Sequence, residues 1–146
     1  MVRISAVLAA VAIALAPIPG AAQTVKRTPL PTDHPLVGTW RIDLPQVNCH
    51  ELYQIKTDGT TQVTSGEQAA ESEVELSLKP SAKGFYKWVD KITKENGKPD
   101  CMGDVMQVGH VATNYIVLHP NGDRFLMCAA EDMDTCIGPF IRQAGI

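Results

Sequence analysis

The chain has little net charge, and it lacks an apolar segment long enough to cross a membrane as a helix. Its 146 residues include 13 basic and 16 acidic side chains, which gives a net charge of −3. A mildly acidic protein offers no basic surface to nucleic acid or to an anionic membrane. The apolar run over residues 4–16 is shorter than the about 20 residues that a spanning helix needs. We therefore expect no nucleic-acid partner and no membrane span.

The sequence also lacks the motifs of common hydrolases and zinc sites. It contains no Gly-x-Ser-x-Gly, no Ser-x-x-Lys and no Cys-x-x-Cys. His50, His110 and His119 would form a catalytic or metal site only if the fold brought them together with a carboxylate such as Glu51 or Asp104. We predict no catalytic residue, no cofactor and no metal ligand, and expect a non-enzymatic protein.

The first 22 residues have the pattern of a secretory signal peptide. Arg3 supplies a positive charge, residues 4–16 are apolar apart from Ser5, and Gly20-Ala21-Ala22 provides small residues for cleavage. The alternative is an uncleaved N-terminal helix. Residues 23–35 contain three prolines and little that is apolar, which is typical of an extended linker. We therefore expect an exported protein, periplasmic or secreted, with a single domain over residues 36–146.

Four cysteines follow the predicted cleavage site. They are Cys49, Cys101, Cys128 and Cys136. An even number of cysteines in a small exported domain predicts two disulfides, because that compartment is oxidising. Three pairings are possible. We favour Cys128–Cys136, because the seven residues between them suit a hairpin loop; Cys49–Cys101 would then join the early and middle parts of the chain.

The remaining sequence alternates between apolar and polar residues with the period of half-buried strands. In the clearest example, residues 73–79, the side chains of Val74, Leu76 and Leu78 are expected to face inward. Turn signals separate the alternating segments, and they include Asp58-Gly59, Asn96-Gly97 and Asn121-Gly122. Seven or eight short strands with such turns predict an all-β domain, a small antiparallel barrel or a sandwich.

Some segments have a less regular pattern. Residues 49–55 carry polar and apolar side chains on both faces, which indicates a strand near an edge or a mouth, with Glu51 and Tyr53 on the same face. Residues 85–93 form another expected strand, in which Trp88 and Asp90 share a face. We expect one helical turn over residues 67–72 and a strand around residues 105–111.

The stretch Leu36-Val37-Gly38-Thr39-Trp40, at the start of the domain, resembles the N-terminal signature of lipocalin-like barrels. In that superfamily the Gly and the Trp lie at the closed end, below the ligand cavity. The resemblance implies a structural role for Gly38 and Trp40, and a small apolar or amphipathic ligand inside the barrel. The start is also similar to that of avidin-like barrels, but those surround their ligand with several tryptophans, and this chain has only Trp40 and Trp88.

A protein partner is the alternative to a small ligand. The loop over residues 129–135 carries Glu131, Asp132 and Asp134 between two cysteines. A loop fixed by a disulfide loses less conformational entropy on binding. Its carboxylates would suit a basic partner, as in an inhibitor that inserts an acidic loop into the cleft of an enzyme such as lysozyme.

Overall fold

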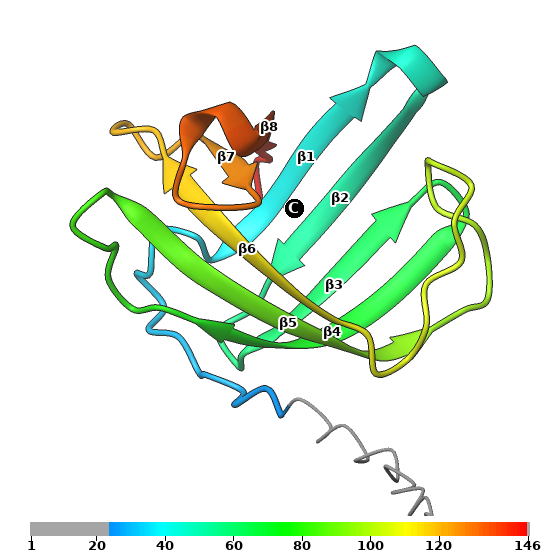
Figure 1. Ribbon diagram of the computed structural model, residues 1–146, viewed down its shortest axis with the longest axis horizontal. Helices are drawn as coiled ribbons and strands as arrows, with labels where there is room; N and C mark the ends of the chain where they lie inside the picture. Colours follow the sequence, from blue (N-terminus) through cyan, green and yellow to red (C-terminus); the bar gives the residue numbers. More distant parts are fainter. Residues whose placement is uncertain (1–23, 146) are drawn as a thin grey trace, which may run out of the picture.

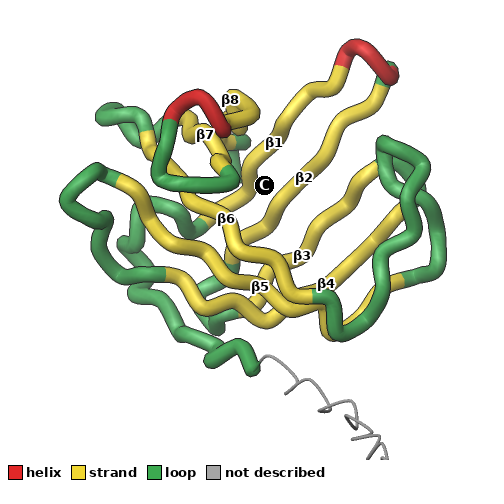
Figure 2. Tube along the Cα trace, in the orientation of Figure 1, coloured by secondary structure: helices red, strands yellow, loops and turns green. Residues whose placement is uncertain are grey.

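Eight antiparallel strands close into a barrel in the computed structural model, which describes residues 24–145 (Figure 1). Each strand pairs with the next in sequence, and the last pairs with the first. The strands are β1 (Gly38–Leu44), β2 (Cys49–Ile55), β3 (Thr60–Ser65), β4 (Gln68–Leu76), β5 (Phe85–Glu95), β6 (Val111–Leu118), β7 (Arg124–Cys128) and β8 (Cys136–Arg142). Two short 3-10 helices, η1 (Pro45–Val47) and η2 (Met133–Thr135), lie in connections (Figure 2). The predicted all-β barrel is confirmed.

The two ends of the barrel differ in how they are covered. Because neighbouring strands run in opposite directions, the connections β1–β2, β3–β4, β5–β6 and β7–β8 lie at one end, which we call the mouth. The other connections lie at the closed end, where residues 24–37 also pack (Figure 1). There Leu30 is buried, and its backbone N–H donates to the Thr57 carbonyl at 2.8 Å. No helix among the described residues is long and apolar enough to span a membrane. The predicted signal peptide, residues 1–22, lies outside the described residues.

A cluster of rings fills the barrel at the closed end. Trp40 is fully buried, and its indole N–H donates to the Leu36 carbonyl at 2.9 Å. Its ring meets Phe125 edge-on at 4.7 Å between centroids, and Phe125 stacks on Phe140 at the same separation. Burial of three large rings and Leu36 contributes several kcal/mol, at about 1.5–3 kcal/mol for each buried side chain. The closed end is therefore solid core.

Arg142, the last residue of β8, stabilises the closed end through contacts of its side chain. Its guanidinium lies 4.1 Å from the Trp40 ring centroid and donates to the backbone carbonyls of Val37 at 2.9 Å, Gly122 at 3.0 Å and Pro35. A Cβ on Gly38 would approach the Arg142 Nη1 atom to 2.8 Å, and Gly38 has a φ of +136°. A side chain at Gly38 would therefore strain the backbone and displace the arginine.

Both predicted disulfides are present, and both lie at the mouth. Cys49–Cys101 joins the start of β2 to the β5–β6 connection, and Cys128–Cys136 closes the β7–β8 connection. The cysteine pairing favoured from the sequence is confirmed. The Cys49–Cys101 disulfide holds the long β5–β6 connection, residues 96–110, beside the end of the β3–β4 hairpin. This long loop therefore lies at the rim of the mouth (Figure 1).

Three local predictions were wrong. Residues 68–72 belong to β4 and not to a helical turn, because Gly66, with a φ of +59°, lets the chain reverse directly from β3 into β4. Leu78 is 57% exposed, since β4 ends at Leu76 before the inward alternation reaches it. Residues 105–110 form a loop, and the following strand begins only at Val111.

Candidate functional site

A cavity of about 190 Å³ occupies the mouth half of the barrel, above the packed rings. Its polar lining comes from five strands and the long loop, with the side chains of Glu51, Tyr53, Thr61, Ser65, Gln68, Ser72, Asp90, Asp100 and Asn114. Its apolar lining comes from Val63, Ala70, Trp88, Ile92, Met106, Ala112 and Met127. The interior of this barrel is thus apolar at one end and mixed at the other.

The register of the strands explains why so many polar groups face inward. Side chains of directly opposite residues lie on the same face of a sheet. Ser65 is paired with Glu51 on β2 and with Gln68 on β4, while Thr61 is paired with Ser72. The hydrogen-bonded ladder therefore gathers polar residues from three neighbouring strands on one patch of the inner wall.

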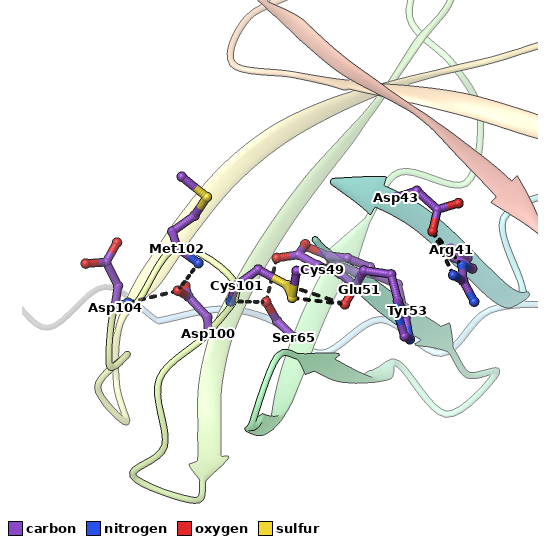
Figure 3. Close-up of a disulfide and its surroundings, with 11 residues drawn as sticks. Arg41, Asp43, Cys49, Glu51, Tyr53, Ser65, Asp100, Cys101, Met102 and Asp104 are labelled. Carbon is purple, nitrogen blue, oxygen red and sulfur yellow. Dashed lines mark hydrogen bonds and ion pairs between the residues drawn. A yellow bond between two sulfur atoms is a disulfide. The ribbon is translucent and has the colours of Figure 1, made fainter. Parts of the chain in front are cut away.

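The Glu51 carboxylate is the centre of a hydrogen-bonded group at the mouth. The Tyr53 hydroxyl donates to its Oε2 atom at 2.8 Å, and the Ser65 hydroxyl donates to its Oε1 atom at 2.6 Å. The backbone N–H of Cys101 in turn donates to the Ser65 hydroxyl at 3.0 Å. Figure 3 shows this group beside the Cys49–Cys101 disulfide. The disulfide thus holds the long loop against the group that fixes the position of the carboxylate.

A second carboxylate, Asp90, faces the cavity from β5. The indole N–H of Trp88 donates to its Oδ1 atom at 3.0 Å. Burial raises the pKa of Asp90, and the hydrogen bond from Trp88 and the charge of His110 partly oppose this rise. Burial and the negative charges of Glu51, Asp90 and Asp100 raise the pKa of Tyr53 well above its usual value. Burial thus makes Asp90 harder to ionise than an ordinary carboxyl group, and Tyr53 stays a neutral hydrogen-bond donor.

Two buried polar atoms in residues that line the cavity have no hydrogen-bond partner. Within residues 24–145, the buried side-chain atoms without a partner are Thr61 Oγ1, Gln68 Nε2 and Glu95 Oε2, and the first two belong to cavity-lining residues. Thr61 is fully buried, and Gln68 is 6% exposed. A buried polar group without a partner costs about 1–3 kcal/mol. Each of these two residues therefore carries a polar atom whose desolvation is not offset within the protein.

The long loop forms part of the roof. Asp100 and Met106 reach the cavity from it. The Asp100 carboxylate accepts the backbone N–H groups of Met102 and Asp104, both at 2.9 Å, which closes a tight turn (Figure 3). The Asn96 side chain ties the start of the loop to the Glu67 carbonyl at 3.0 Å. These hydrogen bonds and the Cys49–Cys101 disulfide therefore hold the long loop in place over the cavity.

The histidines do not form a common site. His50 and His110 lie near the mouth, at the start of β2 and just before β6, whereas His119 follows β6 at the closed end. His34 is buried at the closed end as well, where its Nε2–H donates to the Ser77 carbonyl at 3.3 Å and its Nδ1 accepts from the Leu36 N–H. Among the described residues, no three His, Cys, Asp or Glu side chains are grouped so as to hold a metal ion.

The acidic loop lies apart from the cavity. Asp132 and Asp134 are exposed and Glu131 is half-buried. The Asp132 carboxylate caps η2 by accepting the Asp134 N–H at 3.0 Å, so one of the three predicted partner-binding groups is already engaged within the loop. Met133, between them, lines an apolar groove of about 440 Å³ with residues of β6 and β7 and with Pro139.

Sequence reasoning did not select most of the cavity residues. It placed Glu51 with Tyr53, and Trp88 with Asp90, but assigned no role to Thr61 or Gln68. Comparison of the chain with protein-family models, curated proteins and solved structures finds no match.

Proposed function

We propose that this protein is a non-enzymatic binding protein that holds a small amphipathic ligand in the cavity at the mouth of its barrel. The observation that carries this proposal is a pair of buried polar atoms without a hydrogen-bond partner, Thr61 Oγ1 and Gln68 Nε2, in two residues that line the cavity. A bound molecule that hydrogen-bonds to both would remove their desolvation cost. Apolar side chains on the same wall, such as Val63 and Met127, would contact its carbon atoms.

The size of the cavity limits the ligand. Its volume of about 190 Å³ is smaller than the about 300–1,000 Å³ of pockets for drug-sized molecules. The mixed lining favours an amphipathic molecule over a purely apolar one, because an apolar ligand would leave the polar atoms of Thr61 and Gln68 unpaired. The ligand of this proposal is thus a small molecule with polar groups along one side.

Export and a lipocalin-like relationship belong to the same proposal. Two disulfides support an oxidising compartment, periplasmic or extracellular. The position of Trp40 in the closed end of an eight-stranded barrel supports the lipocalin-like resemblance. Both fit a protein that captures a small molecule outside the cytoplasm.

Native mass spectrometry of the purified protein, with its disulfides intact, tests the proposal. We expect a retained small molecule, or one gained from a panel of small polar metabolites, that is lost in Thr61→Val. Thr64→Val is the matched control, because Thr64 lies on the same strand and is exposed. A wild-type protein that binds nothing, or equal binding by both variants, would refute a ligand site in this cavity.

Protein binding through residues 129–135 remains the second candidate. The observation in its favour is the exposure of Asp132 and Asp134 beside the apolar groove that Met133 lines. An acidic rim next to an apolar groove suits a basic partner with one apolar side chain. Surface plasmon resonance with purified lysozyme, a basic enzyme, provides a defined probe. Binding that disappears when Glu131, Asp132 and Asp134 are replaced by Ala would support this function, and binding that persists would end it.

A further inference from the structure

We infer that the ligand of the mouth cavity is a small organic cation with a protonated amine, held between the carboxylates of Glu51 and Asp90. This inference rests on the proposed function, and it adds the chemical class of the ligand. Glu51 projects from β2 and Asp90 from β5, and β3 and β4 separate the two strands, so the two groups face the cavity from different sides. A cation in the cavity would be attracted by both carboxylates.

The cavity is lined by acidic side chains and by no basic one, and His110, whose charge acts on Asp90, lies outside the lining. The lining includes Glu51, Asp90 and Asp100, and no Lys, Arg or His side chain. The ion pairs found within residues 24–145 involve Asp43, Asp58, Glu71 and Asp123, and none involves a cavity carboxylate. Carboxylates buried at low dielectric are stabilised by an opposite charge. A bound cation would supply that charge.

An ammonium group suits the hydrogen-bonding capacity of Glu51. Each of its oxygens already accepts one hydrogen bond, from Tyr53 and from Ser65. A carboxylate has about four lone-pair sites, so each oxygen can accept one more N–H. These two existing bonds fix the orientation of Glu51 before any ligand arrives, which lowers the entropy lost on binding.

The rest of the lining fits the remainder of such a molecule. The rings of Tyr53 and Trp88 border the cavity and can lie against a cation, which aromatic faces attract. The unpartnered Gln68 Nε2–H needs an acceptor. A carboxylate on the ligand would be repelled by Glu51 and Asp90, so we infer that the acceptor is a neutral oxygen, such as a hydroxyl, ether or carbonyl. The inferred class is therefore small oxygen-bearing amines, such as amino alcohols.

A metal cation fits the cavity less well. Among the described residues, no group of three His, Cys, Asp or Glu side chains is arranged to hold one. Calcium takes six to eight oxygen ligands and therefore requires a denser set of carboxylates and carbonyls. The aromatic and apolar share of the lining, which includes Trp88, Ile92 and Met127, also favours an organic cation.

Titration calorimetry with matched probes tests the inference on the intact protein. Ethanolamine and choline are the cationic probes, and propan-1-ol and 3,3-dimethylbutan-1-ol are their neutral counterparts of similar shape. Calcium chloride is the metal probe. We expect saturable binding of ethanolamine, binding of each neutral counterpart at least about tenfold weaker, and no competition by calcium. Weaker binding of choline than of ethanolamine would show that the N–H donors contribute.

Two variants remove one charge each with little change in shape. Asp90→Asn and Glu51→Gln should each weaken ethanolamine binding by about tenfold or more. Glu67→Gln is the matched control, since Glu67 is exposed in the β3–β4 turn at the same end of the barrel. It should leave the affinity unchanged. If Glu51→Gln fails to fold because it disturbs the bonds with Tyr53 and Ser65, the neutral probes on the wild-type protein and Asp90→Asn still decide the result.

The outcomes separate this inference from the proposed function. If neutral and cationic probes bind equally, or if the protein retains a neutral or anionic molecule that Thr61→Val releases, the cavity is a ligand site and the inference of an ammonium ligand is wrong. If calcium displaces ethanolamine, the inference is also wrong. If no probe binds and no molecule is retained, both the inference and the proposed function are refuted.

Discussion

Replacement of Thr61 by Val should stabilise the protein while it removes ligand binding. Thr61 is fully buried on the inner face of β3, and its hydroxyl has no partner within the described residues. Valine keeps the branched shape that suits a strand, so the change mainly removes the unpaired hydroxyl. An unpaired buried polar group costs about 1–3 kcal/mol, and we expect a gain of about 1–2 kcal/mol in the free energy of unfolding.

The assay is thermal or urea unfolding of the oxidised protein without added ligand. The entropy of unfolding is about 2.1 cal/mol/K per residue, so for a domain of about 120 residues 1 kcal/mol corresponds to about 4 °C in Tm. Thr61→Val should therefore raise Tm by about 4–8 °C. Thr64→Val, on the exposed face of the same strand, should change stability by less than about 0.5 kcal/mol.

A fall in Tm for Thr61→Val would refute the reasoning. It would mean that the hydroxyl has a partner in solution and that the cavity wall is already satisfied. The argument for a ligand would then lose its main support. A rise in Tm together with loss of the ligand would show that this position gives up stability for binding, which is the usual relation at functional sites.

Three further changes test the fold. Arg142→Ala removes the donor to three backbone carbonyls and the contact with the Trp40 ring, and urea unfolding should show a loss of about 2–4 kcal/mol that Arg142→Lys only partly restores. Removal of the Cys49–Cys101 disulfide, with a sequence separation of 52, should cost more than removal of Cys128–Cys136, with a separation of 8; the chain-entropy relation gives about 4 against about 2.5 kcal/mol, and equal losses would contradict it. Burial lowers the pKa of His34 from its ordinary value of 6.5, so the unfolded chain binds more protons below that pH. The free energy of unfolding should therefore have its full value above about pH 6.5 and decrease as the pH falls below this value. His34→Gln should make the free energy of unfolding less dependent on pH over the same range.

The two ends of the barrel have different roles. The ring cluster around Trp40, fastened by Arg142, supplies stability. The mouth carries the polar side chains that a purely structural core would exclude, and both disulfides reinforce this end. The Cys49–Cys101 disulfide holds the long loop beside Ser65, which donates to the Glu51 carboxylate.

The sequence by itself predicted the all-β class and most of the strands, and it favoured the cysteine pairing that the structure has. Asp-Gly and Asn-Gly turns separate short alternating segments, and local chemistry is sufficient for this because a tight turn needs residues that accept positive φ angles. The Asp58 carboxylate, for example, accepts both the N–H and the hydroxyl of Thr60, which fixes the β2–β3 turn within three residues. The Cys128–Cys136 disulfide is also local, because its two cysteines are only 8 residues apart in the sequence.

Only the tertiary structure decided which polar side chains line the cavity. A period of two shows that Glu51 and Tyr53 share a face, but on a strand whose two faces are both mixed it does not show which face turns inward. That choice depends on how the whole sheet curves into a barrel, which turns the face that carries Glu51, Ser65 and Gln68 inward and places Asp90 on another side of the same cavity. Arg142 is similar: its contact with Trp40 joins the last strand to the first, about a hundred residues apart, and no local pattern in the sequence encodes that meeting.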